Sequence, residues 1–180
     1  MSSTDNLRLV IRPGAIGDCL VSLPALESLA PAEVWIPTPL VPLVQFAGSV
    51  RSIASTGLDL LGLHGVTPPP ALLPRLRSFS SIVSWYGANR PEFRAELARL
   101  GLPVHFLPAL PPAGGGRHAV DFYLEQTLAL RLKDVSPVPS LRLRATPRDT
   151  IVIHPFSGSL RKNWPLERFQ ELAATLPLPV

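Results

Sequence analysis

Short apolar runs alternate with longer amphipathic stretches along most of the chain. The apolar and β-branched runs predict strands over residues 7–12, 33–36, 50–55, 81–86 and 104–107. The amphipathic stretches predict helices over residues 19–29, 91–100 and 118–132, with a proline-interrupted helix after the run 33–36. Strands that alternate with helices pack as a parallel, doubly wound sheet, so the predicted fold class is α/β.

The pattern changes after residue 132. Residues 133–149 carry three prolines and alternating leucine and arginine, which is typical of a connector. A new strand is predicted over 151–153, followed by a loop and a helix from Pro165 to about Thr175. We therefore expect a first domain over 1–132, a connector over 133–149, and an incomplete second domain over 150–180. One strand and one helix cannot bury both faces of the strand, so we expect the chain to be truncated or to lack most of this domain.

Composition favours a compact protein of a reducing compartment. Of the 180 residues 46% are hydrophobic, enough for one real core. The single cysteine, Cys19, excludes an internal disulfide framework. The first residues lack the basic segment and apolar run of a secretory signal, which predicts a cytoplasmic location. The longest uncharged stretches, 34–50 and 60–74, are each broken by prolines, whereas a membrane helix needs about 20 predominantly apolar residues.

The charged residues favour an anionic partner. The formal net charge is +4, and of the 17 basic residues only Lys133 and Lys162 are lysines. Arginine suits phosphates, acidic glycans and the inner face of a membrane. No dense basic run with interleaved aromatic residues is present, so we expect no nucleic-acid partner.

Two loops carry candidate chemistry, and the first is the turn from Pro13 to Asp18. Its glycines, Gly14 and Gly17, allow a tight turn at the edge where parallel sheets bind ligands. Asp18 has two interpretations of equal weight from spacing alone, a helix cap and a catalytic base. The base gains weight because six of the glutamates fall in predicted helices, whereas Asp18 is the only acid directly after a glycine turn at a strand end.

Several common chemistries lack their sequence motifs. The first loop has G-x-x-G without the leading G-x-G, and the strand 33–36 has no acid at its end, which argues against dinucleotide binding. There is no P-loop motif, no Asp-x-Asp pair, no His/Cys cluster and no G-x-S-x-G. We therefore expect neither a metal ion nor a bound cofactor.

The second candidate loop runs from His154 to Pro165, between the last predicted strand and helix. It offers small and hydroxyl residues at Ser157, Gly158 and Ser159, with Lys162 just before the helix. Backbone N–H groups at a helix start, close approach and a cation together make an anion site, which a diphosphate fits best. The alternative is a polar loop with solvated cations and Trp164 packed in a core.

Together the two loops resemble glycosyltransferase family 9, the ADP-heptose:lipopolysaccharide heptosyltransferases and their relatives. The first match is IRPGAIGDCLVSLPALESL, residues 11–29, and the second is HPFSG at 154–158 with KNWP at 162–165 and Phe169. The stretch HAVDFYL, residues 118–124, resembles the helix that closes the family's first domain.

The resemblance implies a GT-B architecture of two Rossmann-like domains, with the acceptor bound by the first and the nucleotide sugar by the second. It implies metal-independent, inverting transfer of a heptose or related sugar from a donor such as ADP-heptose. The acceptor would be a lipopolysaccharide-type or other anionic, lipid-linked glycan, reached by peripheral contact with the inner membrane. Asp18 matches the catalytic aspartate, Lys162 the phosphate-binding lysine, and Ser157, Gly158 and Ser159 the residues that touch the diphosphate.

The chain departs from the family because it lacks the later donor segment, similar to D-T/S-G-x-x-H. The resemblance therefore leaves two functions open, a glycosyltransferase and a truncated or degenerate, non-catalytic acceptor-domain binding module, and it does not decide whether this chain alone is active. In the first domain, Gly14, Gly17 and Arg12 belong to the expected acceptor loop. From their positions at strand ends and helix starts, we expect Arg90 and Arg117 to lie near an anionic acceptor. We expect His118 to start a helix.

Overall fold

The computed structural model describes residues 7–112, 116–141 and 149–177. The chain divides into two compact units, Met1–Arg142 and Leu143–Val180. The division falls inside the segment 133–149 that the sequence marks as a connector. In the three described stretches, no helix has both the length and the apolar character needed to cross a bilayer.

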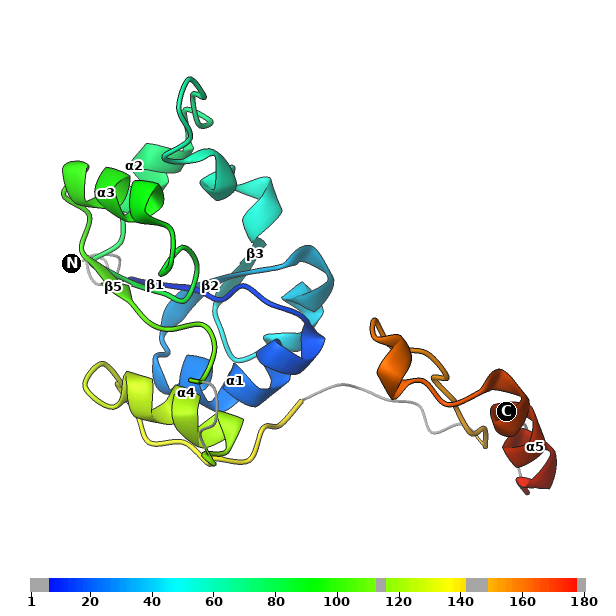
Figure 1. Cartoon of the computed structure of the whole chain (residues 1–180). Helices are drawn as coiled ribbons and strands as arrows, with labels where there is room; N and C mark the ends of the chain where they lie inside the picture. Colours follow the sequence, from blue (N-terminus) through cyan, green and yellow to red (C-terminus); the bar gives the residue numbers. More distant parts are fainter. Residues whose placement is uncertain (1–6, 113–115, 142–148, 178–180) are drawn as a thin grey trace. The chain divides into compact units, whose positions relative to one another are not determined.

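The first unit is built on a five-stranded sheet in the order β3-β2-β1-β4-β5, with all neighbouring strands parallel (Figure 1). The central positions of the register pair Val10 with Val34 on one side and with Val83 on the other. This arrangement confirms the predicted α/β class with a parallel sheet and is Rossmann-like. The strands are β1 Arg8–Ile11, β2 Ala32–Ile36, β3 Ser49–Ser52, β4 Ser81–Ser84 and β5 Val104–Phe106.

Helices cover both faces of the sheet. Helices α1 (Ile16–Ser28) and α4 (Ala119–Thr127) pack on one face, and α2 (Leu72–Arg77) and α3 (Pro91–Arg99) on the other (Figure 1). Successive residues of a strand point to opposite faces, so Val10 joins the α1 and α4 core while Leu9 and Ile11 join the α2 and α3 core. The central strands are therefore buried on both sides, as an apolar parallel sheet requires.

Two predicted helices change their form. The helix expected behind β2 is a 3-10 helix, Thr38–Leu43, because Pro42 within it has no N–H for an α-helical hydrogen bond. Helix α4 ends at Thr127 and not at residue 132. The chain turns there, and the N–H of Leu132 donates to the carbonyl of Ser28 at the end of α1, 2.9 Å away.

Four further elements, between β2 and β4, differ from the sequence prediction. Strand β3 ends at Ser52, and residues 53–55 and 58–60 form short 3-10 helices. The six-residue helix α2 was not predicted at all. It lies between the triple-proline segment 68–70 and β4.

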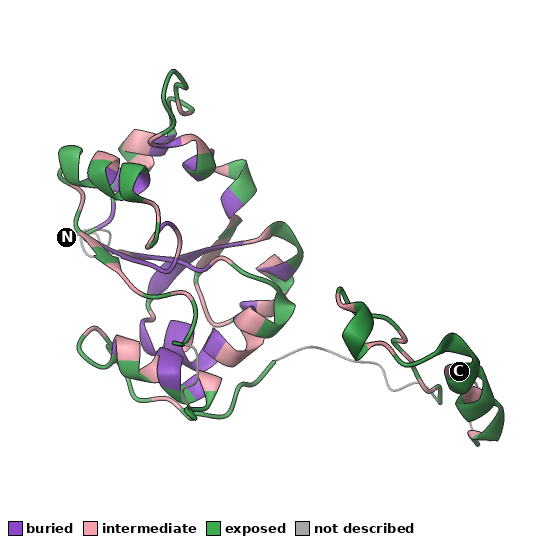
Figure 2. Cartoon of the chain, in the orientation of Figure 1, coloured by how far each residue is buried: buried purple, intermediate pink, exposed green. Residues whose placement is uncertain are grey.

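The second unit contains a 3-10 turn, Leu160–Lys162, and the helix α5, Leu166–Thr175, which confirms the last predicted helix. The strand predicted over 151–153 is wrong, because residues 149–177 contain no second strand to complete its hydrogen bonds. No side chain of residues 149–177 is buried, in contrast to the sheet of the first unit (Figure 2).

Candidate functional site

The loop after β1 is shaped by a backbone conformation that only glycine adopts easily. Gly14 has φ +119°, in the region that L side chains avoid. A Cβ atom at Gly14 would also lie 2.9 Å from Cβ and from Oδ2 of Asp18. Gly17, by contrast, lies within α1, and a Cβ atom there would meet no other atom within 4 Å. Gly14 is therefore required by the turn, and Gly17 is not.

Asp18 stands at the third position of α1, where its carboxylate turns back towards the start of the helix. The N–H of Ala15 donates to Asp18 Oδ2 over 3.0 Å, which satisfies one of the free N–H groups of a helix start. The side chain stays half-exposed and forms no ion pair with any described residue. The geometry thus gives Asp18 part of a capping role while leaving its carboxylate open to a ligand.

The position of this loop in the sheet is the one at which parallel α/β folds bind ligands. The chain moves outward from β1 to β2 and β3 on one side and returns to β4 and β5 on the other, so β1 and β4 flank the topological switch point. Ligands in open α/β sheets bind outside the carboxyl ends of the strands at this point. Asp18 follows the carboxyl end of β1.

Arg12 lies beneath the loop and holds it from inside. Its guanidinium donates from Nε to Ser22 Oγ (2.9 Å), from Nη1 to the carbonyl of Pro13 (2.8 Å) and from Nη2 to the carbonyl of Asp18 (3.1 Å). It also lies 4.6 Å from the ring centroid of Tyr123, and the residue is only 1% exposed. The sequence placed Arg12 in the acceptor loop, and the structure gives it a supporting position there.

Cys19, next to Asp18, is a buried apolar residue and not a reactive thiol. Its exposed fraction is 1%. Burial raises the pKa of the Cys19 thiol to about 11, and the charge of Arg12 offsets this only in part. Cys19 is therefore a small core residue.

The loop after β4, together with α3 and β5, adds residues that the sequence analysis did not single out. A cavity of about 400 Å³ opens at the carboxyl ends of β4 and β5, lined among others by Asn89, Arg94 and Phe106. The Arg94 guanidinium lies 5.0 Å from the Phe106 ring centroid and donates to the carbonyl of Ala88. Asn89 lies in the loop after the predicted strand 81–86, at the same sheet edge as Asp18, which was the available signal. Arg94 and Phe106 lie within a helix and a strand and gave no such signal.

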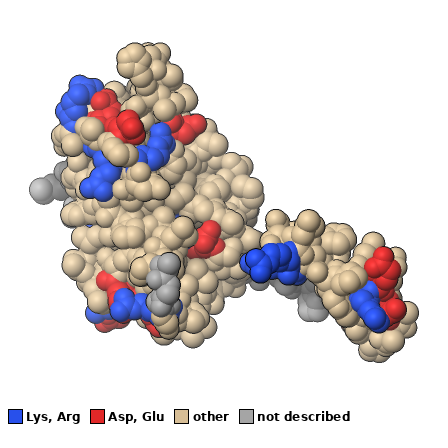
Figure 3. Space-filling model, viewed as in Figure 1, with Lys and Arg blue, Asp and Glu red and all other residues tan. Residues whose placement is uncertain are grey.

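The other residues named from position have local partners. Arg90 donates to the hydroxyl of Tyr86 at 2.9 Å, and Arg117 pairs with Glu125. His118 caps α4, since its Nδ1 accepts from the N–H of Val120 at 3.3 Å, which confirms the predicted helix start. Figure 3 shows basic and acidic side chains interspersed on the face in view, without one continuous basic surface.

In the second unit, Asn163 organises the loop that the sequence assigned to a diphosphate. Its Oδ1 accepts from the N–H of Ser157 (2.7 Å) and from the hydroxyl of the same residue (3.0 Å). The Ser157 hydroxyl also lies 3.1 Å from the carbonyl of Ser159 and accepts from the N–H of Ser159 at 3.3 Å. Asn163 was missed because an asparagine within K-N-W-P carries no motif signal of its own.

This loop surrounds an open cavity of about 750 Å³. Ser157, Gly158 and Lys162 line it, whereas Ser159 does not. Lys162 is exposed, and no carboxylate of the described residues lies within ion-pair distance of it. Trp164 is 48% exposed and packs edge-on against Phe169 at 5.1 Å, so it is not a core residue in this unit. An exposed cation beside small residues is chemically suited to an anion.

Among the residues that the structure describes, no group of three or more His, Cys, Asp or Glu side chains is placed to hold a metal ion.

Comparison of the chain with protein-family models, curated proteins and solved structures found no match.

Proposed function

We propose that this chain supplies the acceptor domain and the diphosphate-binding loop of a GT-B glycosyltransferase. The reaction is metal-independent, inverting transfer of a heptose or a related sugar from a nucleotide-diphosphate donor to an anionic glycan acceptor. The proposal rests on the resemblance of residues 11–29 and 154–169 to glycosyltransferase family 9, and on the geometry of the two loops.

The observation that carries the proposal is the position of Asp18. A half-exposed carboxylate without an ion-pair partner among the described residues follows the carboxyl end of β1, at the switch point of a parallel sheet. The glycine turn at Gly14 and the buried Arg12 guanidinium fix the loop that carries it. A fixed, accessible carboxylate is what proton abstraction from a bound hydroxyl requires.

The proposed chemistry is a single displacement. The acceptor hydroxyl oxygen forms a bond with the anomeric carbon of the donor as the bond from that carbon to the diphosphate oxygen breaks. Asp18 accepts the proton of the hydroxyl, and the nucleoside diphosphate leaves with the bonding electron pair. Because the leaving group is already an anion, it needs charge stabilisation more than a proton.

The second unit supplies that stabilisation in the proposal. Lys162 provides the positive charge, while Ser157 and Gly158, held by Asn163, provide hydroxyl and backbone groups for the diphosphate. Ser159, which does not line the cavity, shapes the loop through its contacts with Ser157.

A second candidate is a non-catalytic binding module that retains the acceptor domain. One contact favours it: the Asp18 carboxylate already accepts from the N–H of Ala15, so a capping role alone would account for an aspartate there.

A transfer assay separates the two candidates. The purified protein is incubated with ADP-heptose, a lipopolysaccharide inner-core acceptor and EDTA, and the acceptor is followed by mass spectrometry. The proposal predicts a gain of a heptosyl unit that EDTA does not prevent. Binding of the acceptor without any gain in mass, from ADP-heptose or from other nucleotide sugars, would support the binding module instead.

A further inference from the structure

A cluster of charged side chains lies on the α2 side of the sheet, where β2 and β3 meet. Glu33 of β2 is 1% exposed, yet it is a carboxylate in an apolar layer. Its Oε1 accepts from the indole Nε1 of Trp35 at 2.7 Å and lies 3.1 Å from Nε of Arg51. Its Oε2 pairs with Nη2 of Arg75, from α2.

The cluster keeps an excess of positive charge and of donors. Burial raises the pKa of Glu33, but the hydrogen bonds from Trp35 and Arg75 and the charges of Arg75 and Arg51 outweigh it, so this pKa is lowered and the group is ionised. Two guanidinium groups therefore face one carboxylate, which leaves one net positive charge. In addition, Nε of Arg75 is buried and has no hydrogen-bond partner among the described residues. A buried donor without a partner is costly unless a ligand completes it.

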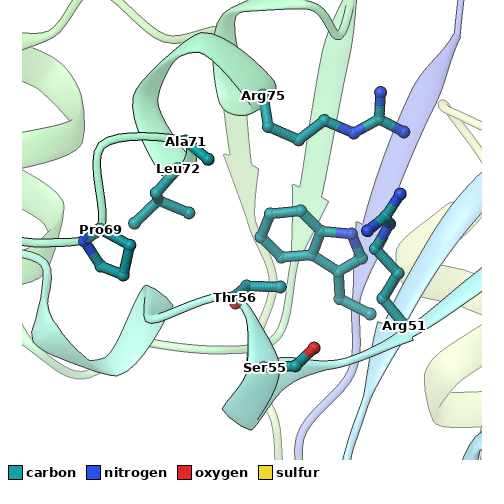
Figure 4. A pocket seen from close by; sticks show the side chains of 8 residues that line it. Arg51, Ser55, Thr56, Pro69, Ala71, Leu72 and Arg75 are labelled. Carbon is teal, nitrogen blue, oxygen red and sulfur yellow. The ribbon is translucent and has the colours of Figure 1, made fainter.

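These arginines line a cavity of about 260 Å³. Trp35 lines the cavity, and Figure 4 shows the guanidinium groups of Arg51 and Arg75 on one side of the view, with Pro69 and Leu72 on the opposite side. The hydroxyl residues Ser55 and Thr56 form a further part of the wall. The cavity is thus cationic at one end and apolar at the other.

We propose that this cavity binds a small organic carboxylate with an apolar body, its carboxylate on Arg51 and Arg75 and its body against Pro69 and Leu72. A planar carboxylate matches the paired donors of a guanidinium, and a single negative charge balances the single excess charge of the cluster. A phosphate dianion fits less well, because it overcompensates that charge and has no group for the apolar wall. The volume lies just below the usual range for small-molecule sites, so the ligand has to be small.

The site is distinct from the loop that carries Asp18. None of the lining residues belongs to the loop after β1 or to the loop after β4. Ligand binding in this cavity therefore does not depend on glycosyl transfer, and either activity can be absent while the other is present.

The test is a titration of the full chain followed by nitrogen-15 and proton NMR, with benzoate as the probe. Benzamide is the uncharged control of the same shape, and inorganic phosphate tests for a general anion site. We expect benzoate to cause saturable shifts of the amides of Arg51, Ser55, Thr56 and Arg75, while benzamide causes none.

Matched variants locate the binding. Arg51→Gln keeps Glu33 paired with Arg75 and Trp35, so the fold is retained, and we expect the dissociation constant for benzoate to rise about tenfold. Arg77→Gln removes an exposed cation from the same helix as Arg75, outside the cavity, and should leave the constant unchanged. The absence of saturable shifts, equal effects of the two variants, or tighter binding of phosphate than of benzoate would each overturn the proposal.

Discussion

Gly14 and Asp18 approach each other so closely that a Cβ atom on the glycine would lie 2.9 Å from both Cβ and Oδ2 of the aspartate. The contact explains why the loop after β1 has a glycine at this point, and it ties the conformation of the turn to the position of the carboxylate. Substitutions at Gly14 therefore act on Asp18 directly.

Gly14→Ala should lower the free energy of unfolding by about 1–3 kcal/mol, because the residue has φ +119° and the new methyl group would displace Asp18. Gly17→Ala is the matched control. It lies inside α1 with open space around it, and alanine is favoured over glycine in a helix by about 1 kcal/mol, so stability should hold or rise. Urea unfolding of both variants measures the difference, and equal stabilities would contradict the assigned turn.

Arg12→Met should destabilise the first unit by about 2 kcal/mol or more. The substitution keeps much of the apolar contact with Tyr123 but removes three donated hydrogen bonds, leaving the carbonyl of Pro13 without its partner. Arg99→Met, at an exposed ion pair with Glu96, is the control and should change stability little. Denaturant unfolding followed by circular dichroism checks both, and a tolerated Arg12→Met would mean that Arg12 does not hold the loop.

Glu33→Gln should reduce stability at pH 7 by about 2 kcal/mol, because two guanidinium groups lose their counter-charge. The pKa of Glu33 is lowered from 4.5, so its contribution is present above pH 4.5 and is lost as the pH falls through the lower folded-state value. The difference between the wild type and Glu33→Gln should therefore shrink when unfolding is measured at pH 3 in place of pH 7. A difference that stays constant over this range would show that the charge of Glu33 is not what stabilises the cluster.

Lys162→Ala should weaken binding of ADP about tenfold, since a lysine–phosphate contact is charge-assisted and Lys162 lines the proposed diphosphate cavity. Arg168→Ala removes a cation of α5 that pairs with Glu171 and does not line the cavity, so it should bind ADP as the wild type does. Calorimetric titration gives both constants. If the two variants weaken ADP binding equally, the loss reflects the net charge of the protein, and Lys162 is not a specific ligand of the diphosphate.

The sheet and the first loop could be predicted from the sequence because local signals determine them. The run at Arg8–Ile11, the glycine turn and the helix behind it follow from periodicity and turn chemistry within about twenty residues. The same signals failed at 151–153, where a β-branched run has no partner strand within residues 149–177. A run of β-branched residues forms a strand only where a neighbouring strand can pair with it.

The charge cluster around Glu33 could not be predicted, because its members come from three separate elements. Arg75 lies 42 positions after Glu33, on a six-residue helix that no sequence pattern marked. The register of β2 and β3 pairs Arg51 with Trp35, and only this pairing brings the Arg51 guanidinium within reach of Glu33. The support of Asp18 by Arg12 was hidden for a similar reason, since alternation in a strand says which face a residue takes but not which partners it meets there.

The rate of heptosyl transfer by the Asp18→Asn variant tests most directly whether Asp18 is the catalytic base. Asparagine can still accept the hydrogen bond from the N–H of Ala15 through its side-chain oxygen, so a capping role survives, whereas it cannot take a proton from an acceptor hydroxyl. The measurement is the rate of heptosyl transfer from ADP-heptose by wild type and Asp18→Asn, with unfolding stability and ADP binding recorded for each. We predict a loss of transfer of at least about a hundredfold, with stability and ADP binding nearly unchanged. Transfer at the wild-type rate by Asp18→Asn would contradict the assignment of Asp18 as the catalytic base and leave it a helix cap.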